Sequence, residues 1–256
     1  MNHMEENNMQ TKMEKRYCFT DQEFLILAGS LGIRSLYGFK PIEPVKTKER
    51  ELYQEFFKMT KKGFLEASED GYLVVPEIRE LFYYLKEAES VIDAFAVDDS
   101  FPEKCVYPGE NAVLIEPGGL QGKYFKCSYD LPEEIREQLC EDGVLLSQNV
   151  ADDILYDPVP MNVGLPEDTE LVRLAVGMGD FDTMAMREEM KKCGVRTIIE
   201  KRNIQLNTLQ KRMFLVERPV YDVILVRDME TTQIFHYSRQ LLLELLKEWM
   251  EEENLG

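Results

Sequence analysis

Histidine is nearly absent from this sequence, which limits the catalytic chemistry that the chain can support. The 256 residues include two histidines, His3 and His236, and His3 lies in a polar N-terminal stretch. One remaining histidine excludes a multi-histidine metal site and argues against Ser-His-Asp or Cys-His catalysis. His236 alternates with Phe235 and Tyr237, a pattern typical of an ordinary strand residue. We therefore expect no catalytic, cofactor-binding or metal-binding residues and no enzymatic activity.

The sequence also lacks paired cysteines and long apolar runs. Its five cysteines are odd in number and widely scattered, and they contain no C-x-x-C pair. This usage is typical of reduced, packed cysteines in a cytosolic protein. No apolar run approaches the roughly 18 residues that a membrane helix needs. Residues 1–17 are polar and predict a disordered leader without a signal peptide. We expect a cytoplasmic protein with no direct membrane insertion.

Basic charge is scarce relative to acidic charge. The chain has 30 lysines and arginines against 48 aspartates and glutamates, a formal net charge of -18 and a pI near 4.6. Such a protein repels a phosphate backbone or an anionic membrane at long range, so nucleic acid is not an expected partner. Hydrophobic residues make up 44% of the chain. This content predicts a globular protein with a large core.

A pattern in residues 111–140 returns 110 positions later, in residues 221–250. Each copy predicts a short strand, a turn, a second strand and a helix with apolar residues at i, i+4 and i+8. The aligned positions are Val113–Ile115 with Val223–Leu225, Phe125 with Phe235, Ser128 with Ser238, and Leu131, Ile135 and Leu139 with Leu241, Leu245 and Trp249. Residues 104–106 and 214–216 add one strand to each copy. We interpret this as an internal pseudo-repeat whose half-sheets join about a pseudo-twofold axis; the alternative is that strand-strand-helix is simply a common unit.

The N-terminal elements follow the order helix, helix, hairpin, helix, which resembles a winged helix. Thr20 to Glu23 form a capping box that starts the first helix, and residues 47–62 predict a longer second helix with Leu52, Phe56 and Met59 on its apolar face. Asp70-Gly71 predicts the hairpin turn, and Pro76 opens the third helix. Lysines on the second helix alternate with glutamates, which favours a solvated face of ion pairs. A winged-helix DNA-binding regulator remains the alternative, and it requires this helix to be exposed and locally positive.

Weak periodicity and three prolines mark residues 141–168 as a junction between halves. The predicted division is therefore a leader at 1–17, an N-terminal half at 18–140, the junction, and a C-terminal half at 169–256. The predicted fold class is α/β (α+β), with a quasi-twofold pseudo-repeat of strand-hairpin-helix units and a winged-helix-like N-terminal segment.

Gly177-Met178-Gly179 does not continue as a phosphate-binding loop, because Asp182 stands where the third glycine belongs. The pattern predicts a glycine turn before a short helix that ends at Gly194. A pocket gathering Asp180, Asp182 and His236 would favour a third hypothesis, an enzyme of unidentified type.

Methionines cluster around this glycine turn and suggest a protein-binding role. Flexible thioethers suit surfaces that accept varied apolar helices, although methionines also fill gaps in cores. The last predicted helix, residues 241–250, has an unusually wide apolar stripe, part of which could serve a partner. The predicted partner-binding residues in these two segments are Met178, Phe181, Met184, Met186, Leu243 and Trp249.

Three features together resemble the EspG family of type VII secretion. They are the opening helix Thr20-Asp21-Gln22-Glu23-Phe24, the run from Gly63-Phe64-Leu65 through Asp70-Gly71-Tyr72-Leu73-Val74-Val75-Pro76 to Ala88, and the two sheet-helix units. The similarity covers about residues 18–250, while the leader and the 141–168 junction fit no pattern of that family. It implies a quasi-twofold α/β cytosolic chaperone, related to a low-GC bacterial lineage, that holds a small helical export substrate of WXG type soluble, with possible contact to the secretion machinery. It implies no cofactor.

Overall fold

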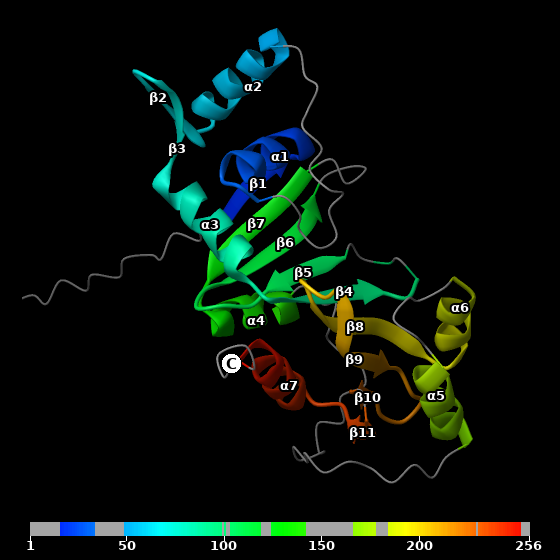
Figure 1. Cartoon of the computed structure of the whole chain (residues 1–256). Coiled ribbons are helices and arrows are strands. Elements are labelled where there is room, and N and C mark those ends of the chain that lie inside the picture. The colour runs from blue at the N-terminus through cyan, green and yellow to red at the C-terminus, as the bar shows by residue number, and fades with distance from the viewer. Residues whose placement is uncertain are drawn as a thin grey trace, which may run out of the picture.

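The computed structural model describes residues 16–33, 49–98, 100, 103–118, 124–141, 166–177, 184–228 and 230–251. Within them the chain forms seven α-helices and eleven β-strands (Figure 1). The helices are α1 (Asp21–Ser30), α2 (Glu49–Lys61), α3 (Pro76–Glu87), α4 (Pro132–Glu141), α5 (Pro166–Gly177), α6 (Met184–Lys192) and α7 (Arg239–Glu251). In this part of the chain, no helix is both long and apolar enough to cross a membrane.

Nine strands form one antiparallel sheet in the order β1-β7-β6-β5-β4-β8-β9-β10-β11. They are β1 (Arg16–Thr20), β4 (Ser90–Ala96), β5 (Lys104–Tyr107), β6 (Ala112–Gly118), β7 (Tyr124–Asp130), β8 (Val195–Asn203), β9 (Thr208–Val216), β10 (Val223–Arg227) and β11 (Thr232–His236). The remaining two, β2 (Leu65–Ser68) and β3 (Gly71–Val74), form a separate hairpin.

The two halves of the chain repeat one order of elements. The first half runs α3-β4-β5-β6-β7-α4, the second runs α6-β8-β9-β10-β11-α7, and the halves join where β4 pairs with β8. The elements match in order, β6 with β10, β7 with β11 and α4 with α7, and Val113–Ile115 and Val223–Leu225 lie on matching strands. The gapless alignment does not hold throughout, because Ser128 lies in β7 whereas Ser238 follows β11, and Leu131 precedes α4 whereas Leu241 lies within α7. The predicted fold class is confirmed. The first strand of each copy buries the same face, since Leu114 and Ile224 both belong to the core cluster under α4 and α7, whereas the aligned Phe125 and Phe235 lie on opposite faces of the sheet.

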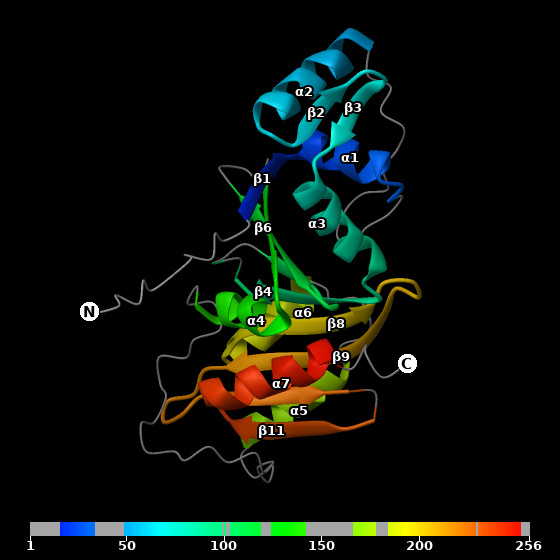
Figure 2. The ribbon, with the colours of Figure 1, turned by 90° about the vertical axis from the view of Figure 1, so that its left-hand side faces the viewer.

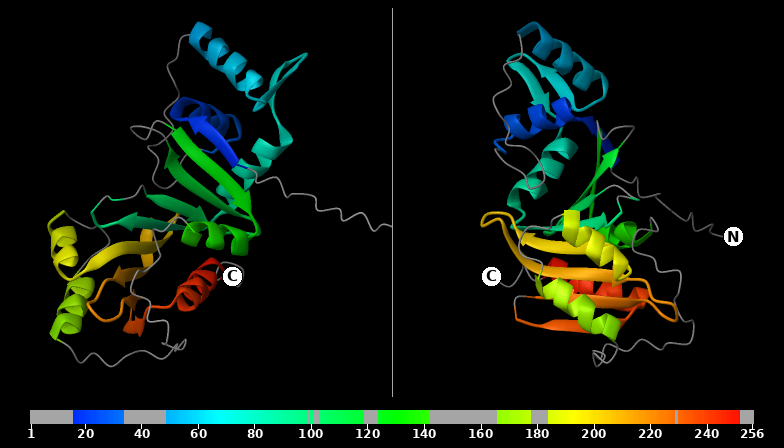
Figure 3. Two further views of the ribbon diagram at one scale, coloured as in Figure 1. Left: turned by 180° about the vertical axis from the view of Figure 1, so that it is seen from behind. Right: turned by 90° about the vertical axis from the view of Figure 1, so that its right-hand side faces the viewer.

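Helices cover both faces of the sheet (Figures 2 and 3). On one face α4 and α7 lie side by side and share one core cluster with the strands on both sides of the β4–β8 junction. On the other face α1 and α3 cover the first half, with α2 and the β2–β3 hairpin beyond them, and α5 and α6 cover the second half. The strand residues facing α4 and α7 alternate with those facing the other helices, as the pleat of a strand requires.

The N-terminal end differs from prediction in one respect. We expected a helix as the first ordered element, but β1 precedes it and pairs with β7 at the edge of the sheet. Only Phe19 of this strand is fully buried, so its apolar alternation is too short to identify it from sequence. The predicted capping box is present, because Thr20 N–H donates to Glu23 Oε2 at 2.9 Å and Glu23 N–H donates to Thr20 Oγ1 at 3.2 Å.

Candidate protein-binding surface

Four aromatic side chains form a surface on α2 and β3, the aromatic surface: Tyr53, Phe56, Phe57 and Tyr72. Tyr53 and Phe57 are 56% and 57% exposed, and Tyr72 is 39% exposed. The rings of Tyr53 and Phe56 are 6.5 Å apart between centroids, and those of Phe56 and Tyr72 are 5.2 Å apart. These contacts make one continuous apolar surface of α2 and the hairpin, which lie at the end of the molecule away from β11 (Figures 1 and 2).

The geometry of α2 explains why these aromatics remain exposed. Met59 is fully buried and anchors the inner face of the helix to the core of the first half. Tyr53 and Phe57 lie one turn apart, so they share one face of the helix and widen its apolar stripe. The stripe is then wider than the two-stranded hairpin that packs on it, so these rings stay exposed. The Lys61 ammonium lies 4.5 Å from the centroid of the Phe57 ring. Helix α2 therefore presents apolar surface with the side chain of one lysine, Lys61, lying against it.

The charge of α2 does not fit the alternative of a DNA-binding helix. Its three basic residues are balanced by its three glutamates, Glu49, Glu51 and Glu55. Lys58 pairs with Glu55, and Lys62, just beyond the helix, pairs with the buried Glu23. A helix that enters the major groove needs unpaired basic residues facing the phosphates. Helix α2 is exposed, but it is not locally positive, so the condition for a regulator is not met.

The predicted partner-binding residues lie on different parts of the molecule. Met178 and Phe181 are outside the described residues, and Met184 begins α6. Met186, on the same helix, is half-buried against the core cluster of the second half, whereas Leu243 is half-buried on the opposite face of the sheet. Trp249 is 1% exposed, so a partner could reach it only if α7 moved. Their role in binding stays a prediction. The described residues among them lie on two separate surfaces, α6 on one face of the sheet and α7 on the other.

A buried polar row crosses the sheet at the β4–β8 junction, on the face opposite α4 and α7. Cys105, Asp93, Glu200 and Arg212 lie directly opposite one another on four successive strands. Arg212 Nε donates to Glu200 Oε1 at 2.6 Å, and Arg202 donates to Glu200 Oε2 through Nε at 2.9 Å and Nη2 at 2.7 Å. Guanidinium groups thus neutralise the carboxylate of Glu200. The arrangement is that of a structural ion cluster.

Part of this row also has metal-ligand spacing. One ligand atom from each of Asp93, Glu103 and Cys105 lies within 4.8 Å of the others. However, the Cys105 thiol donates to Asp93 Oδ1 at 2.8 Å, and burial followed by the Asp93 charge raises the pKa of Cys105 well above its usual value. A thiol must lose its proton to bind a metal. Without a metal, the proton of the Cys105 thiol therefore satisfies the buried Asp93 carboxylate.

His236 is not part of a catalytic group of side chains among the residues that the structure describes. The imidazole of His236 is half-buried at the end of β11 and makes an edge contact with the ring of Tyr221, with centroids 4.5 Å apart. Asp180 and Asp182, which would have to join it, lie outside the described residues. The hypothesis of an enzyme built on these three residues stays untested.

Comparison with known proteins gives one informative likeness. No family model and no curated protein matches the sequence. Among solved structures, the chain is similar to the type VII secretion system chaperone EspG5 of Mycobacterium tuberculosis, solved in complex with the PE25–PPE41 dimer. The TM-score is 0.54 at 12% identity, and the match covers 92% of this chain and 96% of that chain. The chain has an EspG-like fold. At this identity the likeness establishes architecture alone.

The aromatic surface of this EspG-like fold was not identified from sequence. Phe56 belongs to the predicted apolar face of the second helix, and Tyr53 and Phe57 flank it. A wide apolar stripe predicts deep packing as readily as an exposed face, because periodicity reports only which residues share a side. The small size of the predicted hairpin could have indicated this surface, because two four-residue strands cannot cover three aromatic rings.

Proposed function

We propose that this protein is a non-enzymatic chaperone that binds a helical protein and covers its apolar stripe before export. The observation that carries the proposal is the exposed aromatic surface on a fold shared with a secretion chaperone. Contiguous exposed aromatic side chains usually mark a site where another molecule binds. Tyrosine and phenylalanine supply most of the binding energy in such contacts while losing little side-chain entropy.

The shape of the surface favours a helix as the occupant. Tyr53 and Phe57 are spaced by one helical turn, and Tyr72 extends the surface sideways across the hairpin. An amphipathic helix presents residues at i, i+4 and i+7 that fit between such rows. The Lys61 ammonium lies over the Phe57 ring, so an acidic residue beside the partner's apolar stripe would be complementary to it.

The type of partner that we propose rests on the likeness to EspG5, which was solved in complex with the PE25–PPE41 dimer. In our proposal the partner is a small helical protein exported by a type VII system, of the WXG kind or similar, and the complex forms in the cytoplasm. Contact with the secretion machinery would follow binding. Release is necessary for export, so we expect micromolar rather than nanomolar affinity, about -8 kcal/mol.

Met184 and Met186 remain a second proposed contact surface. Helix α6 lies on the second half of the sheet, with Met186 half-buried in its core cluster. A partner long enough to reach both halves could use α6 together with the aromatic surface. The two surfaces can be separated by mutation because they lie on different helices.

The experiment compares capture by three double variants with capture by the wild type. The tagged protein is incubated with nuclease-treated host lysate, and the partner is then purified and its affinity measured by isothermal titration. Tyr53→Ser with Phe57→Ser tests the aromatic surface, and Met184→Ser with Met186→Ser tests α6. Leu206→Ser with Val220→Ser is the matched control, because these apolar side chains are 73% and 78% exposed elsewhere on the molecule.

We expect the Tyr53/Phe57 variant to bind at least about tenfold more weakly than the wild type, since truncated aromatic anchors dominate such losses. The control should bind like the wild type, and circular dichroism should show all variants folded. Equal affinity of the Tyr53/Phe57 variant and the control would place the partner elsewhere. If the purified partner is not helical, or remains soluble without this protein, the chaperone proposal itself is wrong.

A further inference from the structure

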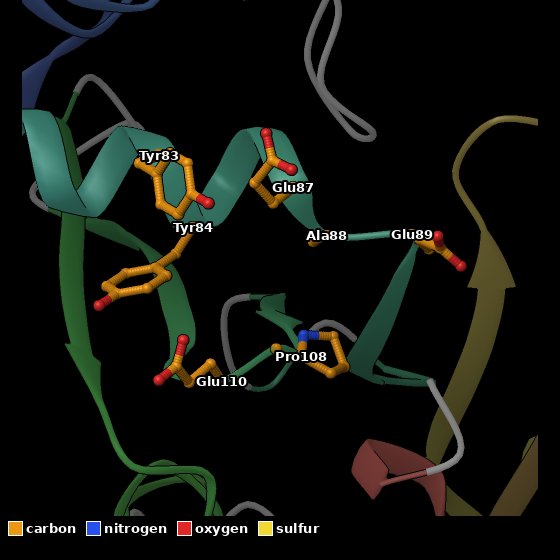
Figure 4. Close-up of a pocket in the computed structure, with 8 residues that line it drawn as sticks. Tyr83, Tyr84, Glu87, Ala88, Glu89, Pro108 and Glu110 are labelled. Atoms are coloured by element: carbon orange, nitrogen blue, oxygen red, sulfur yellow. The ribbon is translucent and has the colours of Figure 1, made fainter. Parts of the chain in front are cut away.

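A small cavity opens where the C-terminal end of α3 faces the turn between β5 and β6. Its volume is about 220 Å³. The side chains that surround it come from α3 on one side and from this turn on the other (Figure 4). The lining residues are Tyr83, Tyr84, Glu87, Ala88, Glu89, Pro108, Gly109 and Glu110. Cavities that enclose whole drug-sized ligands span roughly 300–1,000 Å³, so this one has room for a single side chain or a small polar group.

The lining has the chemistry of a cation receptor. Glu87, Glu89 and Glu110 are exposed carboxylates at the rim of the cavity that point in different directions (Figure 4), and none of the described residues that line it is basic. Tyr83 is 58% exposed and its ring stands beside that of Tyr84, with centroids 5.8 Å apart. Carboxylates and aromatic faces together are the groups that hold guanidinium and ammonium groups in proteins. An anion would meet only repulsion here.

One wall of the cavity is held rigidly before any ligand arrives. The Tyr84 hydroxyl donates to Glu80 Oε1 at 3.1 Å and accepts from Asn111 Nδ2 at 2.6 Å, which fixes the ring between α3 and the β5–β6 turn. Glu80 also accepts from the Tyr129 hydroxyl at 2.7 Å. Burial, then Glu80 and Glu110, raise the pKa of Tyr84, so the negative field reaches its hydroxyl. Because this aromatic wall is already fixed, binding a ligand would cost less conformational entropy.

The end of α3 is also tied to the sheet. The backbone carbonyl of Glu89 accepts from Ile204 N–H at 2.8 Å, which joins the segment after α3 to the turn between β8 and β9. Leu85, one residue beyond Tyr84, is 2% exposed and anchors the last turn of α3 in the core. Glu87 and Glu89 therefore project from backbone that is held in place on the α3 side of the cavity.

We infer that this cavity receives the lysine or arginine side chain of the bound partner protein, an assignment that rests on the proposed function. Helix α3 follows directly after β3, so the aromatic surface lies near its first turn and the cavity at its last turn. Its 12 residues correspond to about 18 Å at the rise of an α-helix. A partner helix of similar length would place an apolar stripe on the aromatic surface and a basic residue in the cavity. The acidic cavity would then set the orientation of the partner.

The test first uses a small probe that does not require the partner. N-acetyl-arginine amide is titrated into the full chain and followed by NMR at the Tyr83 and Tyr84 ring protons and the Gly109 amide. N-acetyl-citrulline amide, which has nearly the same shape and no charge, is the ligand control. Glu110→Gln and Glu87→Gln each remove one carboxylate from the cavity. Glu188→Gln, an exposed substitution on α6, is the protein control.

We expect saturable shifts with the arginine probe, at least about fivefold weaker binding in Glu110→Gln and Glu87→Gln, and an unchanged response in Glu188→Gln. Citrulline should give no saturable shift. Equal responses to arginine and citrulline, or no response at all, would overturn the cation site. This outcome is independent of whether the wild type captures a partner.

A second experiment identifies the partner residue that enters the cavity. Each arginine and lysine of the captured partner is replaced by glutamine, and binding to the wild type and to Glu110→Gln is compared. Replacing one basic residue of the partner should weaken binding to the wild type but not to Glu110→Gln. Such non-additivity shows that the two residues interact directly. If the arginine probe binds but no partner residue couples to Glu110, the occupant is not a partner side chain and the assignment is wrong. If no partner is captured at all, the proposed function fails while the probe result still stands.

Discussion

Asp93 and Glu200 lie directly opposite each other across the β4–β8 junction, and both are almost completely buried. Two carboxylates facing each other in a protein interior would repel if both were charged and unpaired. The two are compensated differently. Glu200 accepts hydrogen bonds from Arg202 and Arg212, whereas Asp93 accepts the Cys105 thiol. The joint between the two halves is therefore polar at its centre, and its stability depends on complete pairing.

Glu200→Gln tests this dependence. The substitution keeps the shape of the side chain but leaves two guanidinium groups without their carboxylate in a buried site. Breaking a buried pair from one side costs about 3–5 kcal/mol. We expect a loss of this size in the free energy of unfolding, measured by urea denaturation with the fluorescence of Trp249, the single tryptophan, which lies on the buried face of α7.

The control for this prediction is Glu170→Gln. Glu170 pairs with Arg173 on the exposed surface of α5, where ion pairs contribute about 0–1 kcal/mol. If Glu200→Gln lost no more stability than Glu170→Gln, the polar row would not be what holds the joint together.

Gly194 allows the chain to pass from α6 into β8, and we expect its replacement to be costly. Its φ is +81°, and a Cβ built there would lie 2.6 Å from the carbonyl oxygen of Glu217. That same segment is tied back by Glu217 N–H, which donates to the Gly194 carbonyl at 2.8 Å. We expect Gly194→Ala to lower the free energy of unfolding by about 1–3 kcal/mol, because both the backbone and the contact are strained.

The matched control is Gly177→Ala at the end of α5, where a Cβ meets nothing within 4 Å. Alanine favours a helix over glycine, so this variant should be neutral or gain up to about 1 kcal/mol. Similar losses in the two variants, measured by thermal unfolding, would contradict the explanation from backbone strain.

The sequence predicts the repeated units well because their burial is periodic. Val113 to Ile115 and Val223 to Leu225 line matching strands, and Ile135 and Leu241 face the same core cluster. Each apolar spacing reflects one face of one element. The edge strand β1 was not predicted, because an edge strand with one fully buried side chain carries little periodic signal.

Features that depend on several elements could not be predicted from a single sequence. Glu200 and Arg212 look like solvent-facing charges in their strands, yet pairing across the sheet buries both. The cavity near Tyr84 joins a helix end to a turn more than twenty residues later. Periodicity places a residue on a face, but only the tertiary arrangement decides what covers that face.

The cysteines should differ in reactivity according to burial. Burial raises the pKa of Cys140 to about 12, and Cys127 is buried on the opposite face of the sheet with its pKa raised as well, first by burial. Cys18 is exposed on β1. Alkylation requires an accessible thiolate. With iodoacetamide at pH 8, mass spectrometry of peptides should show Cys18 modified in the folded protein, and Cys127 and Cys140 modified only after addition of urea. Modification of Cys140 at the same rate as Cys18 would contradict the burial of α4.

Asp228 should make the stability of the protein depend on pH through the β10–β11 turn. Its Oδ1 accepts from the backbone N–H of Glu230 at 2.8 Å and of Thr231 at 2.6 Å, and Oδ2 accepts from Thr231 Oγ1 at 2.9 Å. The N–H of Thr231, followed by that of Glu230, lowers the pKa of Asp228 below its usual value. The unfolded chain therefore binds a proton more readily than the folded one, so this contribution to stability is present above the unfolded pKa and is lost as pH falls.

Asp228→Asn removes the charge and keeps an oxygen acceptor, so it isolates this contribution. We expect the variant to be less stable than the wild type at pH 7 by up to about 1 kcal/mol, because charge-assisted hydrogen bonds are stronger than neutral ones and this site is partly exposed. The difference should shrink once the pH falls below the unfolded pKa of about 3.9. Urea unfolding from pH 3 to pH 7 measures it. Glu66→Gln, an exposed change on β2 that alters net charge equally, separates the local effect from general repulsion in this acidic protein. A difference between Asp228→Asn and the wild type that stayed constant across this range would show that the carboxylate charge is not what stabilises the turn.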